Sequence, residues 1–176
     1  NTGNVTLDAG TVIQNGYNNY SAKQYGGGIH NTGNLIMNDG AKVCNNTANS
    51  YGGGICNYGT FTMNGGTISG NSNPTWYGGG VYNNGTFIAS GGEISGNNAT
   101  NSTYGYGGGV YNKGTLAMNG DVISGNTANL YGGGVYSTVG INMSDVTISD
   151  NTNGGVEIGG AYIDTSAGEF TLNNLT

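Results

Sequence analysis

Three acidic residues recur at similar places in successive repeats of this chain: Glu93, Asp121 and Asp145. Carboxylates brought together from neighbouring segments can coordinate Ca²⁺, which binds several oxygen ligands. A close pair of acids can also hydrolyse a glycosidic bond. The positions are shifted slightly between repeats, and solvated acids in turns show the same pattern. We predict a protein without a cofactor, and the alternative is a Ca²⁺ site at these three acids.

His30 and Cys56 occupy equivalent positions in neighbouring repeats, so we expect them side by side on the outward face of adjacent strands. A Cys–His pair can form a nucleophile. The pattern supplies neither a third member nor an oxyanion hole, so we predict no catalytic residue. In later repeats the position holds Tyr82, Tyr111 and Tyr136. The residues of this column are therefore interpreted as surface residues.

Trp76 and Tyr104 interrupt the repeat that the other aromatic residues follow. They flank two loops, and Asn98 and Asn101 lie nearby in the sequence. Rigid aromatic rings beside amides suit stacking on a sugar ring or contact with a protein partner. We predict a ligand-binding site at these four residues, for a glycan or for a protein of a host or cell surface.

These residues are positioned by an internal repeat. The motif Tyr-Gly-Gly-Gly-Ile/Val begins at Tyr25 and returns after steps of 26, 26, 29 and 25 residues. A nearly constant step of this size is typical of a solenoid. Adding the partial repeats at both ends gives coils that start near residues 1, 25, 51, 77, 106, 131 and 154.

Each repeat holds three short segments in which every second residue is apolar. In the repeat that starts at Tyr51, the inward residues are Ile55, Phe61, Met63 and Ile68. Alternation predicts strands, and the Gly and Asn residues between the segments predict turns. The sequence therefore predicts an all-β fold, a right-handed parallel β-helix with three strands per coil and about seven coils. One repetitive composition over residues 1–176 predicts a single domain.

Two further columns in the repeat are polar. Asn31, Asn57, Asn83 and Asn112 follow the first strand of successive repeats, and Asn46, Asn71, Asn97, Asn126 and Asn151 close the third. Amide side chains stacked at strand spacing can hydrogen-bond along the stack. We expect both columns to stabilise the solenoid.

The charge of the chain excludes several classes of partner. The chain has three Lys, no Arg and nine acidic residues, for a net charge of −6. Nucleic-acid binding requires clustered basic residues, so we predict no nucleic-acid partner. No apolar run approaches the length of a membrane span, so we predict none.

The residues Ile68-Ser69-Gly70-Asn71 and Gly78-Gly79-Gly80-Val81 carry a resemblance to a family. They resemble the Phe-x-x-Asn and Gly-Gly-Ala-Ile motifs of chlamydial polymorphic outer-membrane proteins, and they are similar to repeats of adhesin-like β-helix proteins on microbial surfaces. The aromatic residue of Phe-x-x-Asn is Ile or Val here. The resemblance implies a secreted rod at the cell surface.

From the repeat we expect a non-catalytic, extracellular structural or adhesive module. The alternative is a carbohydrate-binding or carbohydrate-active protein similar to pectate lyases, which share the β-helix fold. Because terminal coils expose unpaired strand edges, we expect both ends to be covered. The cover would be neighbouring repeats of a longer rod, or further copies stacked head to tail into a filament.

Overall fold

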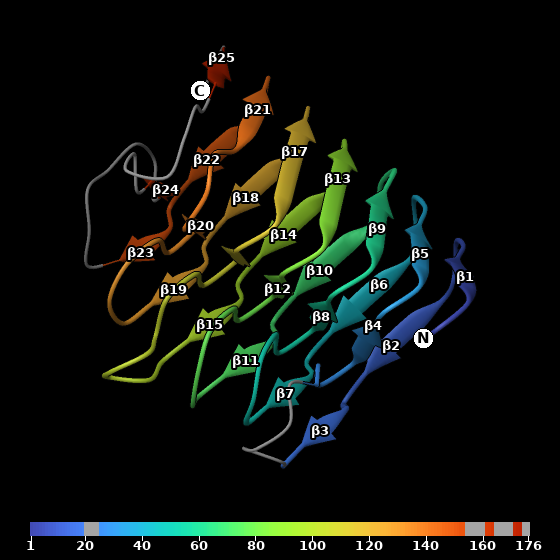
Figure 1. Ribbon diagram of the computed structural model, residues 1–176, viewed down its shortest axis with the longest axis horizontal. Coiled ribbons are helices and arrows are strands. Elements are labelled where there is room, and N and C mark those ends of the chain that lie inside the picture. The colour runs from blue at the N-terminus through green and yellow to red at the C-terminus, as the bar shows by residue number, and fades with distance from the viewer. Residues whose placement is uncertain (20–24, 154–160, 164–170, 174–176) are drawn as a thin grey trace.

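The chain folds into a parallel β-solenoid in which each coil adds one strand to each of four parallel sheets, here called A to D (Figure 1). The computed structural model describes residues 1–19, 25–153, 161–163 and 171–173. These residues contain 25 strands and no helix. The short alternating segments pair in register with the same segments of the next coil, as the repeat predicts.

Sheets A and B follow one another in each coil. The strands of sheet A are β1 (Asn4–Leu7), β5 (Asn34–Met37), β9 (Thr60–Met63), β13 (Thr86–Ser90), β17 (Thr115–Asn119), β21 (Asn142–Ser144) and β25 (Thr171–Asn173). The strands of sheet B are β2 (Val12–Gln14), β6 (Lys42–Cys44), β10 (Thr67–Ser69), β14 (Glu93–Ser95), β18 (Val122–Ser124) and β22 (Thr147–Ser149).

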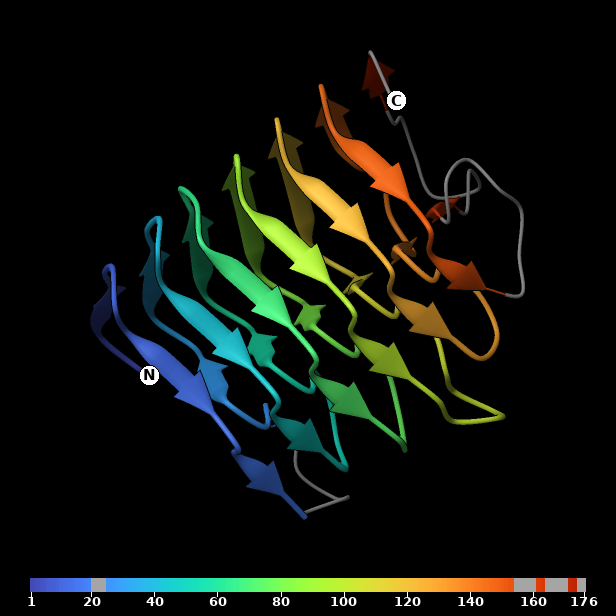
Figure 2. The same ribbon diagram turned by 180° about the vertical axis from the view of Figure 1, so that it is seen from behind.

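Sheets C and D complete the coil. The strands of sheet C are β3 (Tyr17–Asn18), β7 (Thr47–Ala48), β11 (Ser72–Asn73), β15 (Asn98–Ala99), β19 (Thr127–Ala128) and β23 (Thr152–Asn153). The strands of sheet D are β4 (Ile29–Asn31), β8 (Ile55–Asn57), β12 (Val81–Asn83), β16 (Val110–Asn112), β20 (Val135–Ser137) and β24 (Ala161–Ile163). Figure 2 shows sheets B and C along one side of the molecule.

The prediction of three strands per coil misses sheet C. Its strands are two residues long, too short to show alternation in the sequence. The described strands make about five turns, where the repeats predict about seven coils. The five coils that start near residues 25, 51, 77, 106 and 131 have all four strands, whereas the described residues of the coils near 1 and 154 contain three and two strands. Residues 154–160, 164–170 and 174–176 of the last expected coil lie outside the described residues.

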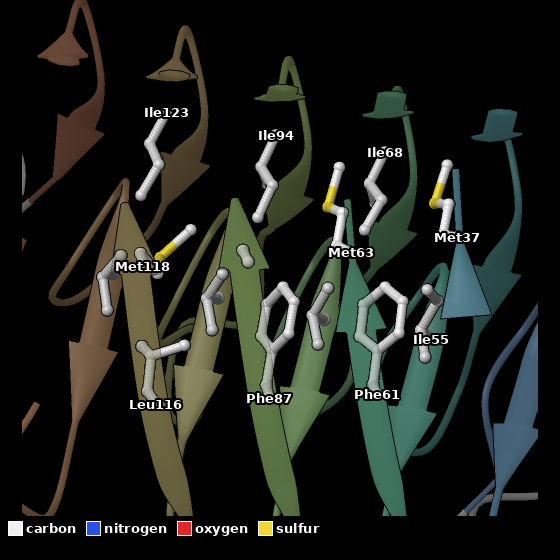
Figure 3. Close-up of a cluster of buried hydrophobic side chains, with 14 of the residues drawn as sticks. Met37, Ile55, Phe61, Met63, Ile68, Phe87, Ile94, Leu116, Met118 and Ile123 are labelled. Atoms are coloured by element: carbon white, nitrogen blue, oxygen red, sulfur yellow. The ribbon is translucent and has the colours of Figure 1, made fainter. Parts of the chain in front are cut away.

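The core lies between the sheets and consists of stacked apolar columns. The inward residues predicted for one coil, Ile55, Phe61, Met63 and Ile68, are all fully buried. The Phe61 ring stacks on the Phe87 ring of the next coil at 4.6 Å between centroids. Figure 3 shows these rings in a row on sheet A, with isoleucines of sheet B facing them. Burial of these columns is the main stabilising contribution.

A side chain is disfavoured at each of the three positions that follow the recurring tyrosine. Gly78, Gly79 and Gly80 show why. Gly78 has a φ of +75°, a conformation that side chains disfavour. A Cβ on Gly79 would lie 2.4 Å from the Gly108 carbonyl oxygen of the next coil. A Cβ on Gly80 would lie 2.6 Å from the Gly109 carbonyl oxygen. The glycines therefore allow successive coils to approach closely.

Candidate functional site

Two loops between sheets C and D position Trp76 and Tyr104 through the same arrangement of hydrogen bonds to an asparagine side chain. In the first loop, Asn73 Oδ1 accepts hydrogen bonds from the backbone N–H of Thr75 at 3.1 Å and of Trp76 at 2.8 Å. In the second loop, Asn101 Oδ1 accepts from the N–H of Thr103 and of Tyr104, both at 2.8 Å. Such asparagine turns hold a short loop without secondary structure. Each loop therefore presents its aromatic residue in a defined position.

The structure brings the two predicted aromatic residues together. The Trp76 and Tyr104 rings stack with centroids 4.7 Å apart and planes 13° apart. Tyr51 contacts Trp76 from the preceding coil at 5.7 Å. Tyr104 keeps 39% of its surface exposed, whereas Trp76 is half-buried. We call Tyr51, Trp76 and Tyr104 the aromatic stack, and Tyr104 is its most exposed member.

The two predicted amide residues have different environments. Asn101 caps its own loop through Oδ1, and its Nδ2 donates to the Pro74 carbonyl oxygen at 3.4 Å, which links the two loops. Asn98 lies in β15, where it pairs with Ser72 and Thr127 of the adjacent coils. The Oδ1 atom of Asn98 is buried without a hydrogen-bond partner. Asn101 therefore belongs to the aromatic loops, and Asn98 lies in the strand before them.

Two rows of tyrosines cover the outer side of sheet D and support the aromatic stack. Ring centroids lie 4.5 Å apart for Tyr51 and Tyr82, and 4.4 Å apart for Tyr77 and Tyr111. The outer row comes from the glycine turns and the inner row from the strands. The rows are Tyr51, Tyr77, Tyr106 and Tyr131 outside, and Tyr82, Tyr111 and Tyr136 inside. Tyr51 is a member of the stack that the loop residues alone do not predict, although its place in the repeat signals it.

The predicted exposure of the column that contains His30 and Cys56 is wrong, although its register is right. His30 pairs with Cys56 in adjacent strands, and Tyr82 continues the column. However, Cys56 is fully buried and Tyr82 is only 4% exposed. The outer tyrosine row folds over this face of sheet D and forms a second apolar cluster with it. Contacts between different coils, which no single repeat shows, cause this burial.

The electrostatics of this cluster argue against a Cys–His nucleophile. Burial raises the pKa of the Cys56 thiol, so the nucleophilic thiolate is disfavoured. Burial also lowers the pKa of His30, with a smaller contribution from the charged amino terminus. The pKa values of Tyr82 and Tyr111 are raised, mainly by burial. The tyrosine cluster is therefore uncharged near neutral pH and suited to uncharged or aromatic ligand groups.

The three acids predicted as an alternative Ca²⁺ site lie at three different register positions. Glu93 pairs with Val122 and is exposed on β14. Asp121 precedes Val122 and is buried, and its Oδ1 accepts a hydrogen bond from the Gly92 N–H at 2.7 Å. Asp145 is exposed in a turn with a φ of 54°. No group of three potential metal ligands forms in the part of the chain that the structure describes.

A groove of about 680 Å³ marks the place where the regular pairing of coils is interrupted at the start of a sheet A strand. A Cβ on Gly114 would lie 2.0 Å from the Gly85 carbonyl oxygen of the preceding coil. The next coil has Val139 at the equivalent position, so it cannot follow the same path. Pairing of β21 with β17 begins only at Ala117 and Asn142. Lys113 is the only charged residue among those that line the groove.

The chain has no counterpart in the comparisons with known proteins: no family model, curated protein or solved structure matches it. Within the described residues, no helix has the length and apolar character to cross a membrane.

Proposed function

We propose that this protein is a secreted, non-catalytic module of a cell surface, with a structural and adhesive role. The observation that carries the proposal is the aromatic stack. Two of its members, Trp76 and Tyr104, lie in loops that depart from the repeat, and the repeat itself is accounted for by packing. The resemblance of the Gly-Gly-Gly-Val and Ile-x-x-Asn motifs to polymorphic outer-membrane and adhesin-like proteins supports the same role.

The contact surface is built on Tyr104, the exposed end of the stack. A sugar ring or an aromatic side chain can stack on this ring, and the amide of Asn101 lies in the same loop. The cluster beneath is uncharged, so it favours neutral ligands over strongly charged ones. The partner is therefore a glycan, or a surface protein with an apolar contact.

Binding to a glycan array, with and without the aromatic ring, tests the adhesive role. We expect Tyr104→Ala to weaken binding roughly tenfold, the effect of losing about 1.4 kcal/mol of contact energy. Tyr17→Ala is the control, because Tyr17 is 65% exposed and belongs to the first coil. Equal loss in both variants, or no binding to any glycan or surface protein, would contradict adhesion at this site.

The second candidate is a carbohydrate-active β-helix protein, and the same aromatic stack is the observation that favours it. Incubation with pectin and with the glycans that bind separates the two functions. We expect no turnover. Turnover that is abolished by Glu93→Gln or Asp121→Asn would replace the non-catalytic proposal with the enzymatic one.

The module also contributes to a rod. The coils are joined through four parallel sheets, so further coils can extend the same columns by pairing with the open strand edges. Extension occurs through neighbouring repeats or through copies stacked head to tail. The partners of the ends are therefore segments of the same architecture.

A further inference from the structure

The outward face of sheet A has a central column in which large and small side chains alternate. We call this column the sheet A face. Its residues pair in register from coil to coil and are Thr6, Ile36, Thr62, Ile88, Ala117 and Asn142. The two isoleucines are 37% and 42% exposed and lie two coils apart. Small or polar residues occupy the positions between and beyond them.

Shallow grooves lie beside the two isoleucines. One groove of about 480 Å³ is bordered by Thr6, Ile36 and Thr62. Another of about 140 Å³ is bordered by Ile88, Ala117 and Asn142. The sheet A face therefore consists of two apolar protrusions, each next to a hollow.

The columns on both sides of the sheet A face are polar and nearly uncharged. Amides pair along them: Asn34 Nδ2 donates to Asn4 Oδ1 at 2.8 Å, and Asn64 Nδ2 donates to Asn38 Oδ1 at 2.9 Å. Within the described residues, Asp8 is the only charged residue at the outward positions of these two columns. The face is thus neutral on a chain with a net charge of −6. A neutral face of this kind does not oppose contact with an identical face.

We propose that the sheet A face binds a second copy of this chain, face to face and with the solenoid axes antiparallel. The two-fold axis runs parallel to the strands and passes between β9 and β13. This arrangement places Ile36 opposite Ala117 of the second copy, and Ile88 opposite Thr62 of the second copy. Each protrusion then meets a small residue, as the interdigitation of facing sheets requires.

Two other placements of the two-fold axis fail on steric grounds. A shift of the two-fold axis by half a coil, onto β9, brings Ile36 opposite Ile88 of the second copy. A two-fold axis along the solenoid brings Ile36 opposite its own equivalent. Both place two large side chains against each other and leave the hollows empty. In the proposed arrangement the flanking columns also match, because Asp8 faces Ser144 of the second copy and no like charges meet.

The size of the face predicts a weak dimer. At the spacings of parallel strands, the contact buries roughly 1,000 Å² in total, the lower limit for a specific interface. The shape favours a second copy over a glycan, because the alternation of protrusions and hollows is complementary to itself. This dimer is closed, and it is independent of the proposed adhesion through the aromatic stack.

Analytical ultracentrifugation over a range of concentrations tests the dimer. We expect a reversible monomer–dimer equilibrium for a chain that carries Val5→Lys, a substitution at the open edge of the first coil that prevents head-to-tail stacking, and at least tenfold weaker association when Ile88→Arg is added. Val122→Arg is the matched control, since Val122 is 38% exposed on sheet B. Dimerisation should be unchanged in this control. A chain that stays monomeric at the highest soluble concentration would overturn the proposal, as would equal effects of both substitutions.

Cysteine cross-linking tests the register. In a Cys44→Ser background, Ile36→Cys combined with Ala117→Cys should give disulfide-linked dimers under mild oxidation. Within one chain these positions lie three coils apart, about 14 Å, which is too far for an intrachain disulfide. Each single cysteine variant should remain unlinked. Equal cross-linking by a single variant would overturn the antiparallel register.

A third outcome concerns the occupant of the sheet A face. If the monomeric chain binds a neutral polysaccharide and Ile88→Arg abolishes this binding, the face belongs to that ligand and not to a second copy.

Discussion

At the scale of single residues, a carboxylate occupies a position that other coils fill with small apolar residues. Asp121 is aligned with Ala41, Gly66, Gly92 and Val146, because each of these residues precedes a paired residue of sheet B. Its oxygens accept hydrogen bonds from the N–H groups of Gly92 and Asn119. Burial nevertheless dominates and raises its pKa to about 6. Asp121 is therefore a buried acid that opposes the stability of the fold once it is ionised.

Asp121 predicts a specific pH dependence of the free energy of unfolding. Between about pH 4 and pH 6 the folded chain binds more protons than the unfolded chain, so stability falls as the pH rises through this window. The decrease is on the order of 2–3 kcal/mol at most. Asp121→Asn should remove this decrease, which denaturant unfolding at several pH values measures.

The control for this measurement is Asp39→Asn, which removes one negative charge from an exposed turn. The change in the free energy of unfolding between low and neutral pH should be the same in this variant as in the unaltered chain. If Asp121→Asn retains the full decrease, the buried carboxylate is not its cause.

At the scale of the elements, the two asparagine columns connect the coils through hydrogen bonds. In the column that ends sheet B, the Nδ2 of Asn71 donates to Asn97 Oδ1 at 3.0 Å and to the Val43 carbonyl oxygen at 2.9 Å. The Oδ1 of Asn71 accepts from the N–H and Nδ2 of Asn46. In the column that follows sheet D, Asn57 Nδ2 donates to Asn83 Oδ1 at 2.8 Å. These buried amides thus join each coil to its neighbours, as the sequence predicts.

Removal of one buried amide should affect more than one coil. Asn71→Ala leaves the buried donors of Asn46 and the Val43 carbonyl oxygen without these partners, so we expect a loss of roughly 2–4 kcal/mol. Asn64→Ala is the matched control, since Asn64 is exposed and makes one amide hydrogen bond along its column. The control should change stability by about 0.5 kcal/mol or less. Similar losses in both variants, measured by denaturant unfolding, would contradict the role of burial.

At the scale of the whole molecule, the first coil exposes the end of the core. Val5 is 38% exposed, whereas its partner in the next coil, Leu35, is 1% exposed. In the described part of the chain, β1 pairs only with β5, so its other edge is open. An open edge and an exposed apolar column together favour the addition of another coil.

Head-to-tail stacking should therefore depend on this end. We expect particles that lengthen with concentration, seen by electron microscopy and light scattering, and we expect Val5→Lys to suppress them because a charge blocks strand addition. Val12→Lys is the control: Val12 is 45% exposed in the same coil but pairs with exposed Lys42 and faces sideways. Particles that do not grow beyond the closed dimer would contradict stacking.

Much of the fold could be predicted from the sequence because the alternation and the repeat that determine it are visible over short stretches of the chain. Alternation places Phe61 inward and Thr62 outward, and the constant repeat places Ile68 beside Ile94 in the next coil. A register error of one residue would reverse every side chain, so the pattern is strongly determined. The proximity of Trp76 and Tyr104 was also predictable, since both lie at the ends of equivalent loops.

Only the tertiary structure decided which of the residues outside the alternating core pattern are buried. The repeat predicts that Cys56 is exposed, but the outer tyrosines cover its face of sheet D. The repeat also predicts that Asp121 is a turn acid or metal ligand, but it is buried in a column that contains Ala41 and Val146. The two-residue strands of sheet C carry no pattern of their own. The repeat thus determined register, whereas burial depended on contacts between coils, which arise only when the coils stack.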